Sequence, residues 1–284
     1  MAKVNLFGKT IEQKTLLREK FVEPPFSILD SKSGSWKMRK QKWKDLGIKS
    51  ELGRNSPSIH MGSKNVKNNV DNYTSIFDPV LCELIYKWFC PEKGKILDPF
   101  CGGSVRGIVA TYLGYKYVGI DLRQEQIDSN NDQANNIIKE NKPIYLVGDS
   151  NVVLDNITDI FDFVFSCPPY FNLEKYSDLD ADLSNMDYDK FLSIYGNIIK
   201  KCCNLLKPNS YACFVVGEIR DKNGYYVGLV PDTINLFKKC GMKYYNEGIL
   251  STPIASASMR AENNMKNQKL TKVHQNILVF KKVI

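Results

Sequence analysis

"ILDPFCGGSVRG", residues 96–107, is the stretch that decides the fold of this chain. A short apolar run ends at Asp98, a turn with Gly102 and Gly103 follows, and a helical pattern begins at Ser104. Glycines let a ligand approach the backbone closely, and the N-terminus of a helix offers unpaired N–H groups. The stretch therefore predicts a strand, a ligand-binding turn and a helix in direct succession.

Strand and helix patterns alternate from this stretch to the end of the chain. Apolar runs bounded by turn residues predict strands at 95–99, 117–122, 144–148, 161–166, 211–217, 243–251 and 276–281. Helical patterns between them cover 104–113, 124–140, 188–206 and 227–240. This alternation predicts an α/β fold, a Rossmann-like doubly wound sheet of seven strands. The polar, basic link 251–275 shows no clear helix and is expected to be a long functional loop.

The N-terminal part has weaker patterns. Residues 1–73 are expected to form an irregular basic appendage with a helix near 36–46, and residues 74–284 the main domain, which opens with a helix at 74–90. The segment from residue 32 to residue 54 contains eight Lys and Arg residues but only two acids, and Trp36 and Trp43 lie among them. Such a segment is either a nucleic-acid surface or an amphipathic helix with two core tryptophans.

The bulk composition excludes several classes of protein. The chain has 43% hydrophobic and 25% charged residues, and no apolar run approaches the roughly 18–20 residues that span a bilayer. No secretory signal is recognisable. Eight cysteines without paired spacing and only two histidines predict free thiols in a cytoplasmic protein and no metal site. A net charge of +8 suits a polyanionic partner.

Polar residues follow the ends of four predicted strands, where ligands bind in open parallel sheets. "GIDL" ends in Asp121 and Leu122, "VGDS" in Asp149 and Ser150, and "FSCPPY" precedes a polar loop. A dinucleotide-binding oxidoreductase is the first competitor, but "CGGSVRG" does not fit its G-x-G-x-x-G register. An acid at Asp98 would repel a pyrophosphate and attract an ammonium group. The pattern favours S-adenosylmethionine as ligand.

With these motifs the chain resembles the amino-methylating branch of class I S-adenosylmethionine-dependent DNA methyltransferases. That family has a D-P-F-x-G turn and a catalytic [Asp/Asn/Ser]-Pro-Pro-[Tyr/Phe/Trp] motif, which "LDPFCGGS" and "SCPPY" match except at one position. The segments "PPFSILD", "WKMRKQKWKDLGIKSELGR" and "HQNILVF" are similar to those of phage and prophage DNA methylases. The resemblance covers nearly the whole chain.

The resemblance implies roles for individual residues. Asp98, Phe100, Gly102 and Ser104 would line the methionine end of the cofactor, with Gly103 in the same turn. Asp121 would hold the ribose, and Asp149 with Ser150 would meet the adenine, although either acid could be a plain helix cap. Further implied cofactor contacts are Thr74, Ser75 and Phe77. The implied catalytic loop is Cys167, Pro168, Pro169 and Tyr170.

Cys167 departs from the family pattern, because a thiol is a weak hydrogen-bond acceptor. Cys167 could replace the family's serine while the Pro168 carbonyl is the main acceptor. Ser166 could instead turn in and supply the oxygen. Thirdly, Cys167 could be a covalent nucleophile, as methylation of a pyrimidine ring carbon requires.

Double-stranded DNA is the expected partner, with adenine N6 or cytosine N4 as the methyl acceptor in a flipped-out base. An RNA methyltransferase, a protein glutamine methylase and a non-catalytic nucleic-acid-binding protein are the alternatives. The expected DNA contacts are Trp36, Lys37, Arg39, Lys40, Trp43, Arg54, Arg260, Lys266, Lys269 and Lys272.

Overall fold

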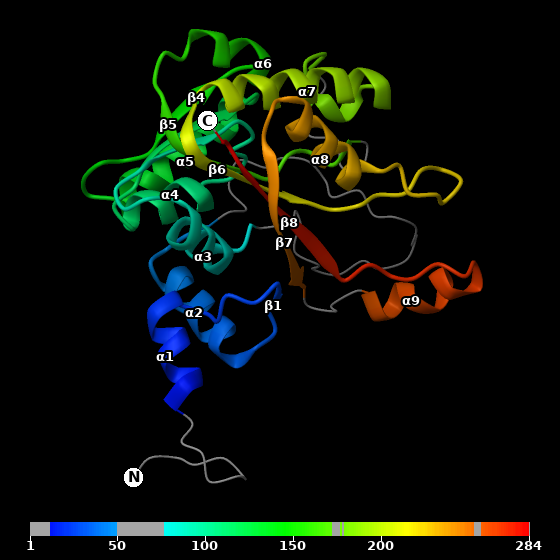
Figure 1. Ribbon diagram of the computed structural model, residues 1–284, viewed down its shortest axis with the longest axis horizontal. Helices are drawn as coiled ribbons and strands as arrows, with labels where there is room; N and C mark the ends of the chain where they lie inside the picture. Colours follow the sequence, from blue (N-terminus) through cyan, green and yellow to red (C-terminus); the bar gives the residue numbers. More distant parts are fainter. Residues whose placement is uncertain (1–11, 50–76, 172–176, 178, 253–256, 284) are drawn as a thin grey trace.

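Eight strands form one sheet in the computed structural model, which describes residues 12–49, 77–171, 177, 179–252 and 257–283 (Figure 1). The strands are β1 (Ile28–Asp30), β2 (Lys95–Asp98), β3 (Lys116–Asp121), β4 (Ile144–Val147), β5 (Phe161–Ser166), β6 (Leu206–Val216), β7 (Lys243–Ser251) and β8 (His274–Lys281). The longer helices are α1 (Glu12–Phe21), α2 (Gly34–Asp45), α3 (Pro79–Phe89), α4 (Val105–Tyr112), α5 (Gln124–Ile137), α7 (Tyr188–Asn204), α8 (Leu229–Lys239) and α9 (Ala257–Lys266), and α6 (Ser150–Val153) is a single turn.

The strand order is β1-β7-β8-β6-β5-β2-β3-β4, and β8 alone of these strands runs antiparallel to its neighbours. All seven predicted strands are present. The strand order reverses between β2 and β5, so the carboxyl ends of these two strands flank a topological switch point. Ligands of open α/β sheets bind at such a point, and the "DPFCGGS" turn and the "CPPY" loop both begin there.

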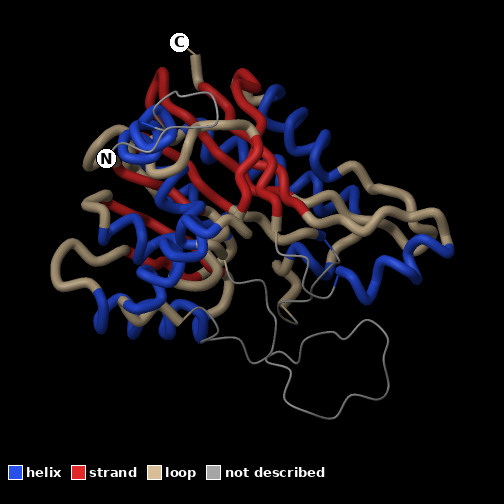
Figure 2. The backbone as a smooth tube through the Cα atoms, turned by 90° about the horizontal axis from the view of Figure 1, so that it is seen from below, coloured by secondary structure: helices blue, strands red, loops and turns tan. Residues whose placement is uncertain are grey.

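Helices cover both faces of the sheet (Figure 2). One buried cluster joins side chains of α2, α3, α4 and α5 to one face of the strands. The other joins side chains of α7 and α8 to the opposite face, with large aromatic residues such as Phe191, Tyr195 and Phe237 at its centre. The predicted helices of the main domain are confirmed as α4, α5, α7 and α8, within three residues of their expected bounds, and as α3, which begins at Pro79 within the helix expected at 74–90.

Residues 12–49, the described part of the N-terminal region, have more regular structure than the sequence predicts. The helix expected near 36–46 is confirmed as α2, but α1 and β1 are additional, and β1 pairs in parallel with β7 as an eighth strand of the sheet. Trp36 and Trp43 are only 1% and 6% exposed, and they pack in the main core against α3. The amphipathic-helix interpretation of this segment is therefore correct for its two tryptophans, which cannot stack on bases.

Two carboxylates of the α3 region anchor α2. Asp78 caps the N-terminus of α3 through the N–H of Val80, and it accepts hydrogen bonds from the Trp36 indole (3.2 Å) and the Lys40 ammonium (2.9 Å). Glu83, one turn further on, binds the Arg39 guanidinium and the Trp43 indole at 2.7 and 3.0 Å. Each tryptophan thus buries its ring and still has a partner for its N–H group.

Replacing Glu83 by glutamine is expected to lower the free energy of unfolding by about 2 kcal/mol at neutral pH, since charge-assisted bonds to Arg39 are lost. Burial opposes the charge of Glu83, but hydrogen bonds from Arg39 outweigh it and lower the pKa of the carboxyl below its ordinary value of 4.5. A carboxyl whose pKa is lowered by folding stabilises the fold at a pH above its pKa in the unfolded chain. That stabilisation is lost as the pH falls through its pKa in the folded protein. Urea unfolding of both proteins should therefore show a difference that is constant near neutral pH and shrinks below about pH 4.5. A difference that grows on acidification would contradict the assignment.

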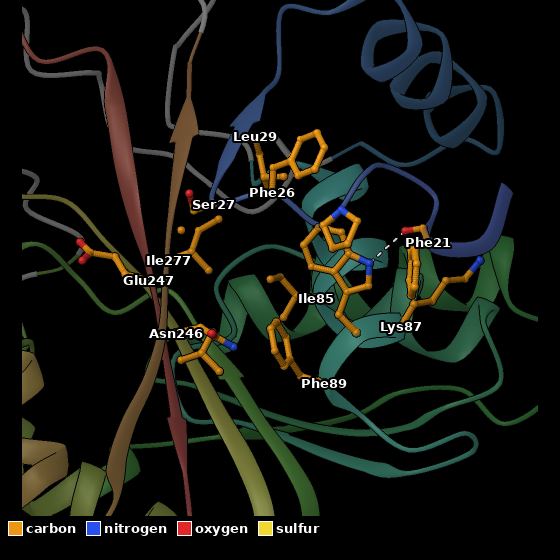
Figure 3. Close-up of a pocket in the computed structure, with 14 residues that line it drawn as sticks. Phe21, Phe26, Ser27, Leu29, Ile85, Lys87, Phe89, Asn246, Glu247 and Ile277 are labelled. Carbon is orange, nitrogen blue, oxygen red and sulfur yellow. Dashed lines mark hydrogen bonds between the residues drawn. The ribbon is translucent and has the colours of Figure 1, made fainter. Parts of the chain in front are cut away.

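A cavity of about 460 Å³ lies beside β1 and β7, against α3 (Figure 3). Aromatic and aliphatic side chains dominate its lining, among them Phe21, Phe26, Ile85 and Phe89, and the Trp88 indole donates to the Phe21 carbonyl at 2.9 Å. Its lining includes none of the residues at the carboxyl ends of β2 and β5. We regard it as a packing groove where α1 and β1 meet the main domain.

The link between β7 and β8 was expected to lack a helix, and this expectation is wrong, because α9 lies within it. Ten residues of this link have helical structure, yet most of their side chains are exposed. No helix among the described residues is long and apolar enough to cross a membrane.

Candidate active site

A cavity of about 750 Å³ lies at the carboxyl ends of the strands and joins the two motifs that opened the sequence. Its lining includes the ligand turn (Phe100, Gly102, Gly103) and the whole catalytic loop (Cys167, Pro168, Pro169, Tyr170). The sequence separates these motifs by about sixty residues, and the neighbouring strands β2 and β5 bring them together. The cavity is large enough for a nucleoside-sized ligand and a second reactant.

The predicted cofactor residues at the ends of β3 and β4 line this cavity. Gly102 has a φ of +48°, a backbone conformation that favours glycine in the turn. Asp121 accepts from the N–H of Arg123 at 2.9 Å, and Asp149 caps α6 through the N–H of Asn151 at 2.8 Å. Ser150 also lines the cavity, and its hydroxyl donates to the Pro99 carbonyl. Both acids thus combine a capping bond with a position on the cavity wall.

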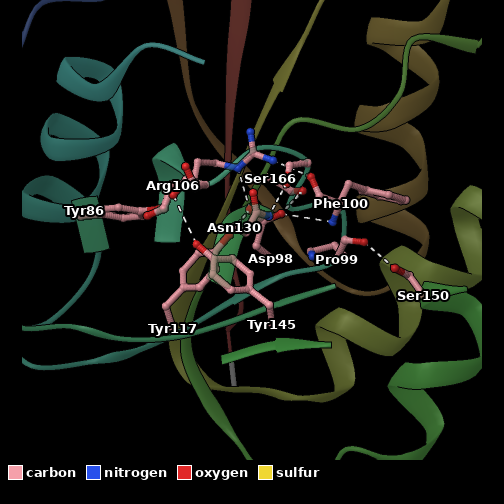
Figure 4. A network of polar contacts seen from close by, with 12 residues as sticks. Tyr86, Asp98, Pro99, Phe100, Arg106, Tyr117, Asn130, Tyr145, Ser150 and Ser166 are labelled. Atoms are coloured by element: carbon pink, nitrogen blue, oxygen red, sulfur yellow. Dashed lines mark hydrogen bonds and ion pairs between the residues drawn. The ribbon is translucent and has the colours of Figure 1, made fainter. Parts of the chain in front are cut away.

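Asp98 has a different partner from the ammonium group that the sequence predicts (Figure 4). Its carboxylate is fully buried behind the cavity wall and forms an ion pair of 2.6 Å with Arg106. It also accepts from the Tyr117 and Ser166 hydroxyls, at 2.6 Å each, and from the Phe100 N–H at 3.1 Å. Four donors therefore occupy both oxygens, and we correct the predicted role of Asp98 to one of holding the ligand turn in place.

Arg106, on α4, is the cation of this network. Burial opposes its charge, but the Asp98 carboxylate raises the pKa of the guanidinium well above its ordinary value. The guanidinium also lies over the Phe77 ring, 4.6 Å from its centroid. Arg106 lines the cavity and binds Asp98 at the same time, so it couples the cavity wall to the ends of β2 and β5.

Two other predicted residues do not face the cavity. Ser166 is fully buried, and its hydroxyl donates to Asp98, so the proposal that Ser166 supplies the acceptor oxygen is not supported. Ser104 precedes α4 and is also buried, and its hydroxyl has no hydrogen-bond partner among the described residues. Phe77 lines the cavity as expected, whereas Thr74 and Ser75 lie outside the described residues.

Tyr170 is held at the end of the catalytic loop. Its hydroxyl accepts from the Gln275 amide at 2.8 Å and lies 3.5 Å from the Val215 carbonyl, and its ring packs on the backbone of Gly217. The Cys167 thiol is 3.6 Å from the same hydroxyl and faces the cavity. The loop therefore presents a thiol, two prolines and a fixed aromatic ring on one wall.

Sequence reasoning missed many polar residues of the cavity, among them Arg106, Gln126 and Gln275, and it gave Lys40 a different role. Lys40 was assigned to DNA contact, but its ammonium lies at the cavity beside Asp78. Gln275 lies in the "HQNILVF" segment. The resemblance of this segment to the family indicates no role for the Gln275 amide. Its position in the antiparallel strand β8, next to β6 and β7, brings it to the catalytic loop.

The predicted DNA contacts divide into two groups. Arg39 and Lys40 are bound to carboxylates of the α3 region, whereas Lys37 on α2 is exposed and Arg54 lies outside the described residues. In the β7–β8 link, Arg260 and Lys266 are exposed and Lys269 and Lys272 are partly exposed. No group of three or more His, Cys, Asp or Glu side chains in the described residues could hold a metal ion.

The strand order, the antiparallel strand β8 and the cavity at the switch point define the Rossmann-like fold of class I methyltransferases. The candidate RNA methyltransferase PH1948 from Pyrococcus horikoshii has this fold, with a TM-score of 0.50 and 16% identity over 87% of this chain and 100% of that one. TrmN from Thermus thermophilus is similar with a TM-score of 0.49 and 14% identity, over 73% of this chain and 49% of that one. These likenesses concern the fold alone.

Within this class, the chain belongs to the DNA methylase family of N6 and N4 methyltransferases, whose family model matches residues 11–132 and 161–283. The type II beta methyltransferase M.BslI from Bacillus sp. (strain NEB-606) is 29% identical over 165 residues. That match covers 53% of this chain and 17% of M.BslI, so the chain spans less than a fifth of this relative's length.

Proposed function

We propose that this protein transfers the methyl group of S-adenosylmethionine to the exocyclic amino group of adenine (N6) or cytosine (N4) in DNA. One observation carries the proposal: in a chain of the DNA methylase family, the ligand turn and the Cys-Pro-Pro-Tyr loop line the same cavity. A methyl donor held at the turn and a base held at the loop would thus meet without further rearrangement of the sheet.

The residues of the cavity suit S-adenosylmethionine. Asp121 and Asp149 offer carboxylate oxygens to hydroxyl and amino groups at the ends of β3 and β4, and Phe100 and Gly102 offer an apolar ring and an open backbone at the turn. Lys40 and Arg106 also line the cavity, and their N–H groups would donate to a carboxylate in addition to the bonds that they make to Asp78 and Asp98. When bound, the donor supplies an electrophilic methyl group on a sulfonium centre.

The catalytic loop has to prepare a poor nucleophile, because the lone pair of an exocyclic amino group is delocalised into the ring of the base. The backbone carbonyl of Pro168, the acceptor that the family's motif implies, accepts more strongly than the Cys167 thiol, and hydrogen bonding to it would localise that lone pair on the nitrogen. The two prolines fix φ, so the acceptor is in place before the base arrives. The ring of Tyr170 would stack on the flipped-out base.

The experiment that tests the proposed function is mass spectrometry of nucleosides from the DNA of cells that express the protein. We expect N6-methyladenine or N4-methylcytosine above the level of cells with an empty vector. Appearance of 5-methylcytosine instead would replace the amino-group reaction by ring-carbon methylation. Methylated RNA with unmethylated DNA would assign the activity to RNA.

Changing Cys167 to serine separates the open roles of this residue. We expect Cys167→Ser to keep kcat/KM within about fivefold of the wild type, and Cys167→Ala to do the same, because one neutral hydrogen bond is worth about 1 kcal/mol. Methyl transfer to DNA in vitro measures the effect, and Cys240→Ser, at a partly exposed cysteine away from the cavity, is the control. Loss of all activity in the serine variant would make Cys167 a covalent nucleophile.

A further inference from the structure

Two links leave the sheet at the edge where the active-site cavity opens. One is the β6–α8 link, residues 218–228, and the other is the β7–β8 link with α9, described over residues 257–273. Both project from the body of the molecule in the same direction (Figure 1, yellow and red). We refer to residues 218–228 and 257–273 together as the arm.

The two parts of the arm touch each other. The Lys269 side chain lies across Gly224, so closely that a Cβ at Gly224 would be 1.9 Å from the lysine nitrogen. Within the first part, the Arg220 guanidinium stacks on the Tyr226 ring at 3.9 Å and donates to the Gly224 carbonyl at 2.7 Å. These contacts give the arm a defined shape in place of two independent loops.

The base of the arm is part of the cavity wall. Thr252 and Gln275, which flank the β7–β8 link, both line the cavity, and the Thr252 N–H donates to the Val273 carbonyl at 3.0 Å. Gln275 also holds the hydroxyl of Tyr170 in the catalytic loop. A macromolecule bound along the arm would therefore lie next to the loop that receives the base.

The arm exposes large apolar side chains to an unusual degree. Among the described residues, the three large hydrophobic side chains with the highest exposed fraction are all on it: Met259 (77%), Leu270 (75%) and Tyr225 (73%). In residues 257–273, Met259 and Leu270 lie among four cations, Arg260, Lys266, Lys269 and Lys272, and a single acid, Glu262. Cations bind the phosphates of a nucleic acid, and exposed apolar side chains can insert between its stacked bases.

We propose that the arm opens duplex DNA for this enzyme: its cations bind the backbone, and Met259 and Leu270 wedge into the base stack so that the target base can leave it. This inference rests on the proposed function and adds the element that makes the target base accessible. Inserted apolar side chains offset part of the stacking that is lost when a base leaves the duplex. Across the whole arm there are six cations (Arg220, Lys222, Arg260, Lys266, Lys269 and Lys272) and three acids (Glu218, Asp221 and Glu262), and this excess of positive charge favours DNA over a second protein as the partner.

The test compares two duplexes that contain a methylation site mapped in expressing cells. In one duplex the target base is paired, and in the other it faces an abasic site, so that little energy is needed to flip it. We expect the double variant Met259→Ala, Leu270→Ala to lose about tenfold or more in kcat/KM on the paired duplex and less than about twofold on the abasic one. Both side chains are exposed, so folding is not at risk. Met38→Ala, at a side chain 67% exposed on α2, is the matched control.

Each other outcome overturns the inference in a recognisable way. Equal losses on both duplexes would make the arm a DNA-binding element that does not open the helix. Wild-type kinetics on both, with altered sedimentation of the protein, would make it an interface between copies of the chain. If no methylation site could be mapped in the DNA of expressing cells, the proposed function itself would be refuted, and the inference with it.

Discussion

Replacing Arg106 by methionine is expected to lower the free energy of unfolding by about 3–5 kcal/mol. The substitution leaves the carboxylate of Asp98 charged, fully buried and without its 2.6 Å ion pair. Removing one partner of a buried ion pair lowers the free energy of unfolding far more than replacing both partners by apolar residues does, because it leaves a buried charge without a partner. Urea denaturation of both proteins, followed by circular dichroism, measures the difference.

Two further variants make this result specific to the ion pair. Asp98→Asn in the Arg106→Met background should recover part of the loss, because the amide oxygen still accepts from Ser166 and Phe100 without a buried charge. Arg123→Met, at a cavity arginine whose ion pair with Asp121 is partly exposed on both sides, should cost less than about 1 kcal/mol. Equal losses for Arg106→Met and Arg123→Met would contradict the role of the buried network.

The strand ends are the part of this protein that its sequence predicts best. Apolar runs such as "FDFVFS" in β5 are bounded by turn residues. Because such strands are buried on both faces, the apolar run alone predicts them, whichever strands they pair with. β1 cannot be predicted in this way, because it has three residues, of which only Leu29 is buried. Its pairing depends on β7, which lies more than 200 residues further along the chain.

The partners of charged residues are what the sequence could not give. Asp98 stands where an acid could face a ligand, but its donors come from α4, β3 and β5 as well as from the turn. Trp36 and Trp43 interleave with lysines as a nucleic-acid surface would, and only the distant carboxylates of Asp78 and Glu83 reveal them as core residues. Periodicity indicates which face of a helix is apolar, but it does not show which distant carboxylate satisfies a buried donor.

Replacing Tyr170 by alanine is expected to lower kcat/KM for DNA methylation by about 10- to 100-fold, since stacking of a base on an aromatic ring is worth about 1–3 kcal/mol. The ring is held by contacts that do not involve a ligand: the backbone of Gly217 lies against it, and Gln275 and Val215 bind its hydroxyl. Its position is therefore set before the base arrives, which limits the ordering cost of binding.

Tyr170→Phe is the matched control, because it keeps the ring and removes the contacts of the hydroxyl, among them those to Gln275, Val215 and Cys167. We expect this variant to stay within about fivefold of the wild type. Binding of S-adenosylmethionine, measured by calorimetry, should change little in either variant if Tyr170 serves the base and not the donor. If both variants lost the same activity, the hydroxyl and its bond to Gln275 would be the functional feature. If the alanine variant kept wild-type kinetics, the base would be held elsewhere in the cavity. The comparison therefore decides whether the catalytic loop acts through its aromatic face or through its hydrogen bond to β8.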